Sequence, residues 1–355
     1  MSYRPFKPDR VYIAHDAANY RKTKDILSKL DNIEQIYIDD LSQVHDTKKS
    51  IVLARQKGNF YKNCPGTKNY ICCGYQILNL VNNCEIDCTY CILQGYLNVP
   101  YILIYVNIDD MFNELSDLFG SNRDKYYRVG TGELADSLST DHITGYSSEL
   151  VEFFSNKSNA IIELKTKTNQ IENFIDVDHG GRTVVSWSLN TPRIMSTEEA
   201  NAPSLTERLA AAKSCEEAGF KIGFHFDPMI YYPEWEDEYY FVIEQLFKYI
   251  DPKSIIWISL GGLRYPPHLE NIIKERHPKS EIIYGEFITG LDGKLRYFKS
   301  IRIEMFKKMV SWIKKRDPDI FTYICMGDSD VWRGAFGWTP GDNTTLKNMM
   351  DNLIK

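Results

Sequence analysis

The stretch Cys84-Glu-Ile-Asp-Cys88-Thr-Tyr-Cys91-Ile-Leu-Gln94 decides how the rest of the chain is interpreted. Its three cysteines are spaced CxxxCxxC, so three thiolates can bind one metal cluster from a single short loop. A [4Fe–4S] cluster normally takes four thiolates, and three ligands leave one iron open. The alternative is a zinc site, whose ligands usually come as two CxxC pairs or as a CxxC pair and a His pair. No such second pair follows, so the spacing favours an iron–sulfur cluster.

The composition predicts a globular protein in a reducing compartment. The chain has 355 residues, 43% of them hydrophobic, eight cysteines and a formal net charge of −6. The beginning of the sequence lacks the apolar stretch of a secretory signal, and no apolar run is long enough to cross a bilayer. We therefore expect a cytoplasmic protein with no membrane partner. The acidic charge is unusual for a nucleic-acid enzyme, although a local basic patch can act on an acidic protein.

Three regions are predicted from the pattern along the chain. Residues 1–70 are expected to form a small α/β extension, with strands at 10–13, 35–38 and 50–53 and a helix within 16–30. Residues 71–285 alternate strands with helices, which predicts a parallel sheet curled into an open or partial barrel. The expected barrel strands are 76–81, 101–106, 126–129, 160–165, 183–189, 221–226 and 255–260. The expected helices are 111–119, 205–218, 239–250 and 269–275, of which the second carries a capping box at Ser204 and Glu207.

The cysteine loop follows the 76–81 strand, and reactive groups in barrels of this kind sit at the C-terminal ends of strands. Residues 286–355 are expected to pack on the barrel. They contain a hairpin around Gly290-Leu-Asp-Gly293, a basic helix over 301–315, a last strand within 321–326 and an aromatic tail.

The cysteine stretch resembles the signature of the radical SAM superfamily, in which the open iron binds S-adenosylmethionine (SAM). Five further motifs occur in an order that resembles the spore photoproduct lyase family. They are Cys91-Ile-Leu-Gln-Gly-Tyr-Leu, Tyr101-Ile-Leu-Ile-Tyr-Val-Asn107, Asp141-His-Ile-Thr144, Leu164-Lys-Thr-Lys167 and Ser186-Trp-Ser-Leu-Asn190. The resemblance is weak before residue 60 and good from about 60 to 330.

The resemblance implies an α/β fold, a partial (β/α)6 TIM-type barrel of the radical SAM type, with a DNA-contacting hairpin near its C-terminus. It also implies repair of the thymine dimer 5-thyminyl-5,6-dihydrothymine in DNA. In this family a 5′-deoxyadenosyl radical made from SAM takes hydrogen from C6 of the dimer, and SAM is regenerated at the end. The dimer must be turned out of the DNA stack for this chemistry. The implied partners are DNA and a one-electron reductase such as flavodoxin or ferredoxin.

Residue by residue, the resemblance assigns cluster binding to Cys84, Cys88 and Cys91. It places Gly132 and Glu133, and then Ser137, beside the methionine part of SAM, and Lys167 at the SAM carboxylate. Ser188 and Asn190 would complete that pocket. Tyr90, between the second and third cysteines, matches a family tyrosine. Arg296 and Tyr297 in the hairpin resemble a pair that contacts the lesion and its phosphate.

Two departures from the family pattern concern the hydrogen donor. Repair lyases carry a donor cysteine at a position that we align with Asp136, and this chain has no cysteine between residues 91 and 215. They also carry a tyrosine where this chain has Ile92. A carboxylic acid is a far poorer hydrogen-atom donor than a thiol. Cys72 or Cys73, with Cys64 nearby in sequence, could donate instead, although buried structural cysteines are more common.

Three functions therefore stay open. The first is a radical SAM carbon–carbon lyase acting on the DNA lesion. The second is a radical SAM enzyme on the same scaffold with an RNA or non-nucleic-acid substrate. The third is a non-catalytic iron–sulfur or DNA-binding module, which would not need a SAM pocket.

His225 and Asp227, at the end of a predicted strand, face either the substrate or a structural partner, and Cys325 in the last strand could approach the pocket or pack in the core.

Overall fold

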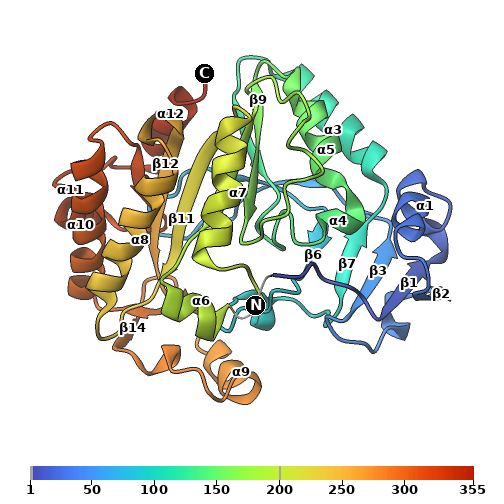
Figure 1. Ribbon diagram of the computed structural model, residues 1–355, viewed down its shortest axis with the longest axis horizontal. Coiled ribbons are helices and arrows are strands. Elements are labelled where there is room, and N and C mark those ends of the chain that lie inside the picture. The colour runs from blue at the N-terminus through green and yellow to red at the C-terminus, as the bar shows by residue number, and fades with distance from the viewer. Residues whose placement is uncertain (1–2, 200) are drawn as a thin grey trace.

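The main feature of the computed structural model, which describes residues 3–199 and 201–355, is an eight-stranded sheet curled into a half-barrel (Figure 1). Its strand order is β16-β12-β11-β10-β9-β8-β5-β4, and all neighbours are parallel except the β4–β5 pair. This arrangement confirms the predicted partial barrel. The strands are β4 (Tyr61–Asn63), β5 (Gln76–Leu78), β8 (Tyr127–Gly130), β9 (Ala160–Thr166), β10 (Thr183–Ser188), β11 (Lys221–Met229), β12 (Ile255–Gly262) and β16 (Thr322–Ile324).

Helices on the outer face cover the half-barrel (Figure 1). The helix α7 begins at the predicted capping box, in which Ser204 and Glu207 satisfy each other's backbone N–H groups. Strands β9 and β10 are buried along nearly their whole length because helices cover one face and polar groups fill the other. The helices around the barrel are α4 (Asp141–Thr144), α5 (Tyr146–Ser155), α6 (Pro192–Glu198), α7 (Leu205–Glu217), α8 (Trp235–Tyr249) and α9 (Leu269–Arg276), with short 3₁₀ turns at Pro252–Ser254 and Ile282–Tyr284.

A second sheet of five strands, in the order β2-β1-β3-β7-β6, forms the N-terminal side of the molecule. It corrects two predictions. The strand predicted at 101–106 is β7, which pairs with β3 of this sheet and not with the barrel. The strand predicted at 76–81 is divided, since β5 joins the barrel whereas β6 pairs antiparallel with β7. The elements are β1 (Arg10–Ala14), β2 (Glu34–Ile38), β3 (Ser50–Ala54), β6 (Val81–Asn82), β7 (Ile102–Tyr105), α1 (Arg21–Ser28), α2 (Leu93–Tyr96) and α3 (Ile108–Ser121), with 3₁₀ turns at His15–Ala17 and Leu41–Gln43.

Most of the C-terminal region packs near the β16 edge of the barrel, whereas the last helix reaches β8, where Asp351 binds Arg128 at 2.8 Å. The predicted hairpin is confirmed as β14 and β15, which form a small antiparallel sheet with β13. The basic residues of α10 are partly paired, since Lys308 contacts Glu236 and Arg316 contacts Glu244 on α8. The elements are β13 (Arg264–Tyr265), β14 (Phe287–Thr289), β15 (Leu295–Tyr297), α10 (Lys299–Arg316), α11 (Ser329–Phe336) and α12 (Asn343–Asn352). No helix of the described residues is long and apolar enough to span a membrane.

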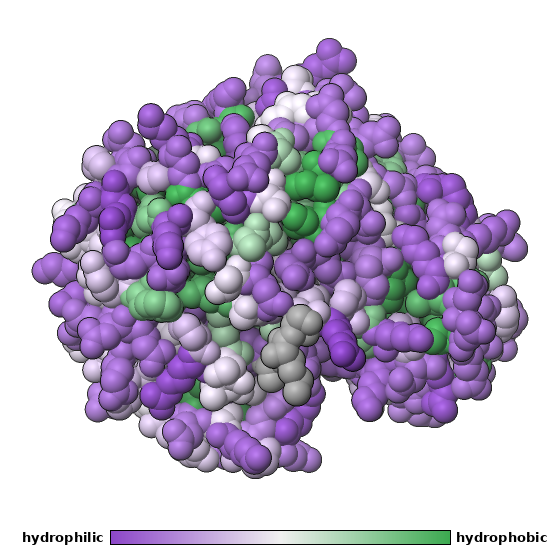
Figure 2. All heavy atoms as spheres, in the orientation of Figure 1, coloured by the Kyte–Doolittle hydropathy of each residue, from purple (hydrophilic) through white to green (hydrophobic). Residues whose placement is uncertain are grey.

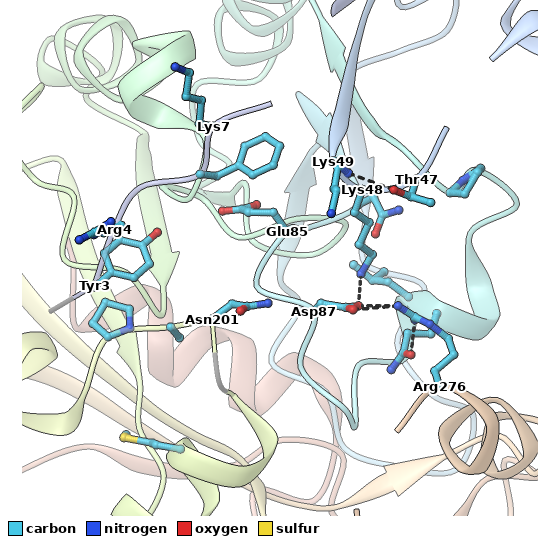
Figure 3. Close-up of a pocket in the computed structure, with 18 of the residues that line it drawn as sticks. Tyr3, Arg4, Lys7, Thr47, Lys48, Lys49, Glu85, Asp87, Asn201 and Arg276 are labelled. Atoms are coloured by element: carbon cyan, nitrogen blue, oxygen red, sulfur yellow. Dashed lines mark hydrogen bonds and ion pairs between the residues drawn. The ribbon is translucent and has the colours of Figure 1, made fainter. Parts of the chain in front are cut away.

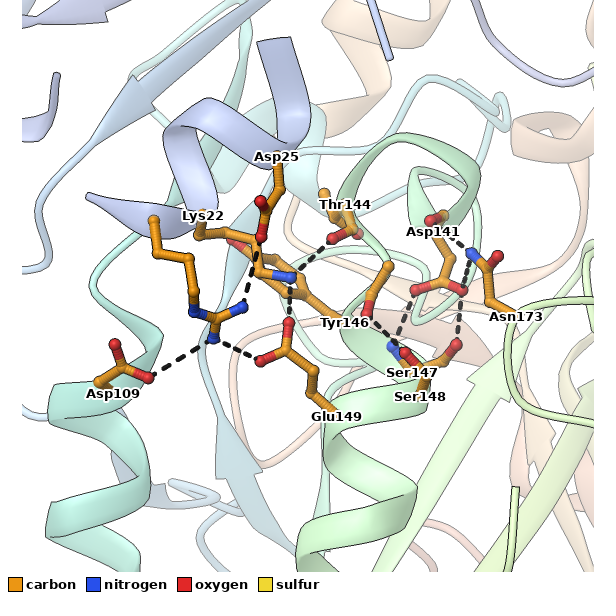
Figure 4. A network of polar contacts seen from close by, with 12 residues as sticks. Lys22, Asp25, Asp109, Asp141, Thr144, Tyr146, Ser147, Ser148, Glu149 and Asn173 are labelled. Atoms are coloured by element: carbon orange, nitrogen blue, oxygen red, sulfur yellow. Dashed lines mark hydrogen bonds and ion pairs between the residues drawn. The ribbon is translucent and has the colours of Figure 1, made fainter. Parts of the chain in front are cut away.

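A polar network joins the N-terminal sheet to the barrel (Figure 4). Its centre is the buried ammonium of Lys22 on α1, which donates to the carbonyl of Thr144 at 3.1 Å and to the carboxylate of Glu149. Arg21 binds the same Glu149 at 2.7 Å and links it to α3 through Asp109 at 3.5 Å. Because α4 and α5 follow the loop at the end of β8, this network fixes the loop's far end.

Replacement of Lys22 with Ala should therefore destabilise the protein. The change leaves the Thr144 carbonyl without its partner and removes one of the two cations at Glu149, a loss we expect to cost about 1–3 kcal/mol. Chemical denaturation of Lys22→Ala beside Lys24→Ala, an exposed lysine of the same helix, measures the difference. Equal stability of the two variants would contradict a joining role for Lys22.

Candidate active site

The cysteine loop lies between the two sheets, because it leaves β6 of the N-terminal sheet and is held by residues of the barrel. The end of α6 holds the two residues between Cys88 and Cys91. Thr89 donates its backbone N–H to the carbonyl of Glu198 at 3.0 Å and its hydroxyl to the Glu198 carboxylate. The hydroxyl of Tyr90 donates to the carboxylate of Glu199. These contacts fix the loop through the protein alone.

The Glu199 carboxylate is itself held by Arg208 of α7, at 2.6 Å, and both side chains are almost completely buried. Arg208 also donates to the carbonyls of Pro203 and Ser188, both at 2.9 Å. Burial alone would raise the pKa of Glu199, but the charges of Arg208 and Lys167 lower it below its ordinary value. The carboxylate therefore stays ionised and connects the cysteine loop to the end of β10.

The residues between Cys84 and Cys88 are also held. Lys48 and Arg276 both bind the carboxylate of Asp87, at 2.6 and 2.8 Å (Figure 3). Glu85 accepts a hydrogen bond from the hydroxyl of Ser139 at 2.9 Å. Burial, followed by the charge of Asp136, raises the pKa of Glu85 to about 7. Both halves of the loop are thus fixed by side chains from distant parts of the chain.

The donor set fits a cluster better than a single metal ion. Among residues 3–199 and 201–355, no group of three His, Cys, Asp or Glu side chains could hold one metal ion. Three thiolates that each bind a different iron need not converge on one point. Burial, followed by the charges of Glu85 and Asp136, raises the pKa of Cys84 well above its ordinary value. Burial raises the pKa of Cys88 to about 12 against the opposing charge of Lys167. Each of these pKa values is also raised by the charge of Cys91.

The loop after β8, residues 131–140, carries the first group of predicted SAM contacts. A side chain at Gly132 would lie 3.1 Å from Lys165, so the close approach of this loop to β9 favours a glycine. The hydroxyl of Ser137 accepts from the backbone N–H of Lys165 at 3.0 Å. The carboxylate of Asp136 accepts four hydrogen bonds, the shortest from the backbone N–H of Lys167 at 2.6 Å and the others from Leu138, Ser139 and Thr166. Asp136 therefore fixes the loop to the end of β9.

The next strand ends carry the second group. The ammonium of Lys167 lies 5.7 Å from the centre of the Tyr90 ring. Burial would lower the pKa of Lys167, but the charges of Cys88 and Glu199 raise it, so Lys167 stays a cation beside the cysteine loop. The side chain of Ser188 is buried at the end of β10. The amide of Asn190 donates to the carbonyl of Pro228 at 3.0 Å and accepts from Tyr239 at 2.7 Å, contacts that give it a structural role.

Four free thiols lie in a different part of the same barrel mouth. Cys64, Cys72 and Cys73 belong to the segment before β5, and the bridge between Ile71 and Gly327 places this segment beside the end of β16. Cys325 follows β16, and its backbone N–H donates to Leu260 of β12. Burial, Asp227 and then Cys73 are among the causes that raise the pKa of the Cys325 thiol. The segment and the strand therefore bring these cysteines, 250 residues apart in sequence, to one side of the barrel.

Comparison with known proteins identifies the family of this chain. The family model described as "Spore photoproduct lyase" matches residues 6–289. The chain belongs to the spore photoproduct lyase family. It is 25% identical over 303 residues to the spore photoproduct lyase of Geobacillus sp. (strain Y412MC61), a match that covers 80% of this chain and 86% of that protein. It is also 25% identical over 308 residues to the lyase of Clostridium acetobutylicum, with 82% and 86% covered.

Solved structures share the fold. A spore photoproduct lyase complexed with dinucleoside spore photoproduct superposes with a TM-score of 0.82 at 23% identity, over 90% of this chain and 100% of the other. A double mutant of a lyase with bound AdoMet and the same dinucleoside gives a TM-score of 0.81, also at 23% identity and with the same coverage. These structures confirm the predicted fold, and membership of the family confirms the predicted class of radical SAM lyase.

A polar network that was not predicted from the sequence fills part of the barrel interior. The carboxylate of Glu163 on β9 accepts from Ser186 at 2.6 Å, from Trp257 at 3.3 Å and contacts the ring of His225 at 2.8 Å. Nearer the strand ends, Arg264 binds Asp227 through two contacts of 2.8 and 3.0 Å. His225 and Asp227 thus have structural partners. Glu163 occupies a strand interior, and no short motif marks it.

Arg296 and Tyr297, the hairpin pair that the resemblance predicts, are buried inside the protein. Arg296 is buried, donates to Asp292 at 2.5 Å and lies over the ring of Tyr70, 4.2 Å from its centre. Tyr297 is fully buried, and its hydroxyl accepts from the backbone N–H of Tyr231 at 3.0 Å. In this structure both residues therefore stabilise the base of the hairpin. Their contact with a lesion stays a prediction.

The Glu163 network makes stability depend on pH in a defined range. Burial alone would raise the pKa of Glu163, but the charge of His225 and the hydrogen bonds from His225 and Ser186 lower it from 4.5 to about 2. A pKa lowered by folding adds stability above the unfolded value, and this stability is lost as the pH falls from about 4.5 towards 2. Glu163→Gln should therefore cost about 3 kcal/mol at pH 7.

Denaturation of wild type and Glu163→Gln as a function of pH tests this expectation. The difference between the two proteins should narrow below pH 4.5 and become small near pH 2. The control is Glu172→Gln, at an exposed position outside the network, which should match wild type throughout. A difference that stays constant over this range would show that the Glu163 charge does not stabilise the fold.

Proposed function

We propose that this chain repairs 5-thyminyl-5,6-dihydrothymine in DNA and that its residues hold a [4Fe–4S] cluster and SAM for this purpose. When bound, these groups supply the 5′-deoxyadenosyl radical that takes hydrogen from C6 of the dimer. Cys84, Cys88 and Cys91 would hold the cluster. The chain's other residues orient the bound molecules, exclude water and return hydrogen to the product.

The observation that carries the proposal is the position of Lys167. Its ammonium is the cation beside Cys88 and Tyr90, at the strand end next to the cysteine loop. A SAM molecule bound at the open iron has a carboxylate to neutralise, and a lysine can supply a charge-assisted hydrogen bond. Gly132 and Ser188, at the ends of the two neighbouring strands, would line the same pocket, and the exposed Glu133 would contact the SAM amine.

The hairpin supports DNA as the partner. The hairpin exposes Leu291 at its tip and Ile288 on β14, which are 71% and 48% accessible. Apolar side chains inserted between bases are a common way to unstack DNA, and a dimer must be unstacked before it can enter the barrel. We propose that the hairpin tip performs this step. The electron would come from a one-electron carrier of the flavodoxin or ferredoxin class.

The hydrogen returned to the product would come from the thiols at the barrel mouth. A hydrogen-atom donor must carry its proton, and burial is the first cause that raises the pKa of Cys64, to about 11, and the pKa of Cys72 and Cys325. Asp136 is committed to its four hydrogen bonds and does not replace the family's cysteine. In the proposed step an S–H bond breaks, a C–H bond forms on the thymine radical, and a thiyl radical remains. That radical regains hydrogen from 5′-deoxyadenosine when SAM is re-formed.

A second candidate function is a radical SAM reaction on an RNA or non-nucleic-acid substrate. Two observations favour it, namely the inward position of Arg296 and Tyr297 and the net charge of −6. The two functions share every residue around SAM and differ only in the substrate side of the barrel.

Reconstituted protein with dithionite and SAM should convert the dinucleotide spore photoproduct to two thymines. It should also incorporate solvent deuterium into the product, since a thiol proton exchanges with water. Absence of 5′-deoxyadenosine in every assay would exclude both enzymatic functions. Formation of 5′-deoxyadenosine without thymine would favour the second candidate.

Cys72→Ala, Cys73→Ala, Cys325→Ala and Cys64→Ala, singly and combined, should identify the donor. Loss of the donor leaves the product radical unquenched, so the ratio of repaired thymine to side products should fall by about tenfold, the effect of about 1.4 kcal/mol on the competing barriers. Cys215→Ala is the matched control, because Cys215 is buried in α7 on the outer face of the sheet. Unchanged product ratios in the combined variant would remove all four thiols from the mechanism.

A further inference from the structure

A groove of about 1680 Å³ runs along the outer side of the cysteine loop (Figure 3). Its walls come from the N-terminal segment, the loop itself, the beginning of α7 and the end of α9. Glu85 and Asp87, the residues next to two of the cysteines, line it. The proposed SAM contacts Gly132, Lys167 and Ser188 are not among its lining residues. The lining of this groove therefore differs from the set of residues proposed to contact SAM.

The exposed charges that line the groove are mainly positive, although the protein is acidic. Five cations line it, and they are Arg4, Lys7, Lys48, Lys49 and Arg276. Four acidic residues also line it, and three of them are bonded to other groups of the protein. Asp87 is paired with Lys48 and Arg276, Glu207 caps α7, and Glu85 accepts a hydrogen bond from Ser139. Only Asp9 is exposed and outside these contacts.

The remaining positive charge is available to a partner. Within the described part of the chain, Arg4, Lys7 and Lys49 are exposed and form no ion pair. Figure 3 shows Lys7 and Lys49 on either side of Glu85. Figure 2 shows a notch in a mainly hydrophilic surface between two lobes, which are the N-terminal sheet with its helices and the barrel. Such a rim attracts an acidic partner and sets its association rate.

We propose that this groove, called here the loop groove, is the docking site of the acidic one-electron carrier that reduces the cluster. The inference rests on the proposed function. Electron transfer weakens steeply with distance, and a carrier in the loop groove is separated from the three cysteines only by the loop they belong to. One electron leaves the carrier and enters the cluster, and no bond forms or breaks. DNA would contact the hairpin β14–β15, none of whose residues lines this groove.

The test is reversal of the two rim charges in Lys7→Glu/Lys49→Glu. The matched control is Lys248→Glu/Lys253→Glu, which makes the same change in net charge at the opposite end of the barrel strands, at the end of α8 and just before β12. The affinity of an acidic flavodoxin for each protein is measured by titration at low and high ionic strength. The bleaching of the cluster by reduced flavodoxin and by dithionite is measured separately.

We expect the loop-groove variant to bind flavodoxin about tenfold more weakly than wild type at low ionic strength, and the difference to shrink at high ionic strength. Its cluster should be reduced more slowly by flavodoxin and at an unchanged rate by dithionite. Equal flavodoxin affinity in both variants would overturn the proposal. So would weaker binding of duplex DNA by the loop-groove variant with unchanged flavodoxin binding, because the groove would then be a DNA surface.

The same proteins separate this inference from the proposed function. Dithionite replaces the carrier, so the dinucleotide assay with dithionite reports on the repair reaction alone. Failure of that assay together with normal flavodoxin docking would reject the repair function and retain the docking site. Repair with dithionite together with charge-independent flavodoxin binding would do the reverse.

Discussion

The buried ion pair between Glu199 and Arg208 is the interaction on which the site depends. It joins three parts of the chain, since Glu199 holds Tyr90 of the cysteine loop and Arg208 holds the end of β10 and the entry to α7. Removal of one partner would leave a buried charge uncompensated, a change that commonly costs about 3–5 kcal/mol. The pair therefore fixes the geometry of the cysteine loop through protein contacts alone. A cluster that binds there would have less of the loop to order.

The position of the loop between two sheets has a further effect. The loop leaves β6 of the five-stranded sheet, while its contacts to Glu198 and Glu199 belong to the barrel. The Lys22 network and the contacts of Asp87 with Lys48 and Arg276 link the same two lobes at other points. Because each of these links is a set of directed hydrogen bonds, the two lobes are fixed in orientation as well as in contact. The loop groove is the space that this arrangement leaves on the outer side.

Much of the architecture could be predicted from the sequence because local patterns determine it. The capping box at Ser204, the hairpin around Gly290 and Gly293 and the barrel strands from β8 onward occur where the pattern placed them. The prediction of which sheet β6 and β7 join was wrong, because hydrophobic periodicity does not determine which strands pair over long distances in the sequence. A strand with a suitable pattern can join either of two sheets, and here the neighbouring β3 determined the choice.

Candidate site residues could be predicted where they belong to a short sequence motif. They could not be predicted where only their contacts in the folded protein distinguish them. The three cysteines and Lys167 belong to recognisable short patterns. Glu163, Arg208 and Arg264 do not, because a buried polar residue in a strand or helix looks like any other until its partner is known. Arg296 and Tyr297 illustrate the opposite case, since a matching pair of residue types occupies the hairpin but is turned inward by Asp292 and Tyr231.

The burial of the thiols at the barrel mouth also bears on their chemical durability. The thiolate is the form that attacks peroxides and disulfides, and a raised pKa keeps its fraction small. Cys64, Cys72 and Cys325 are therefore protected from two-electron oxidation by the same burial that keeps the hydrogen on sulfur.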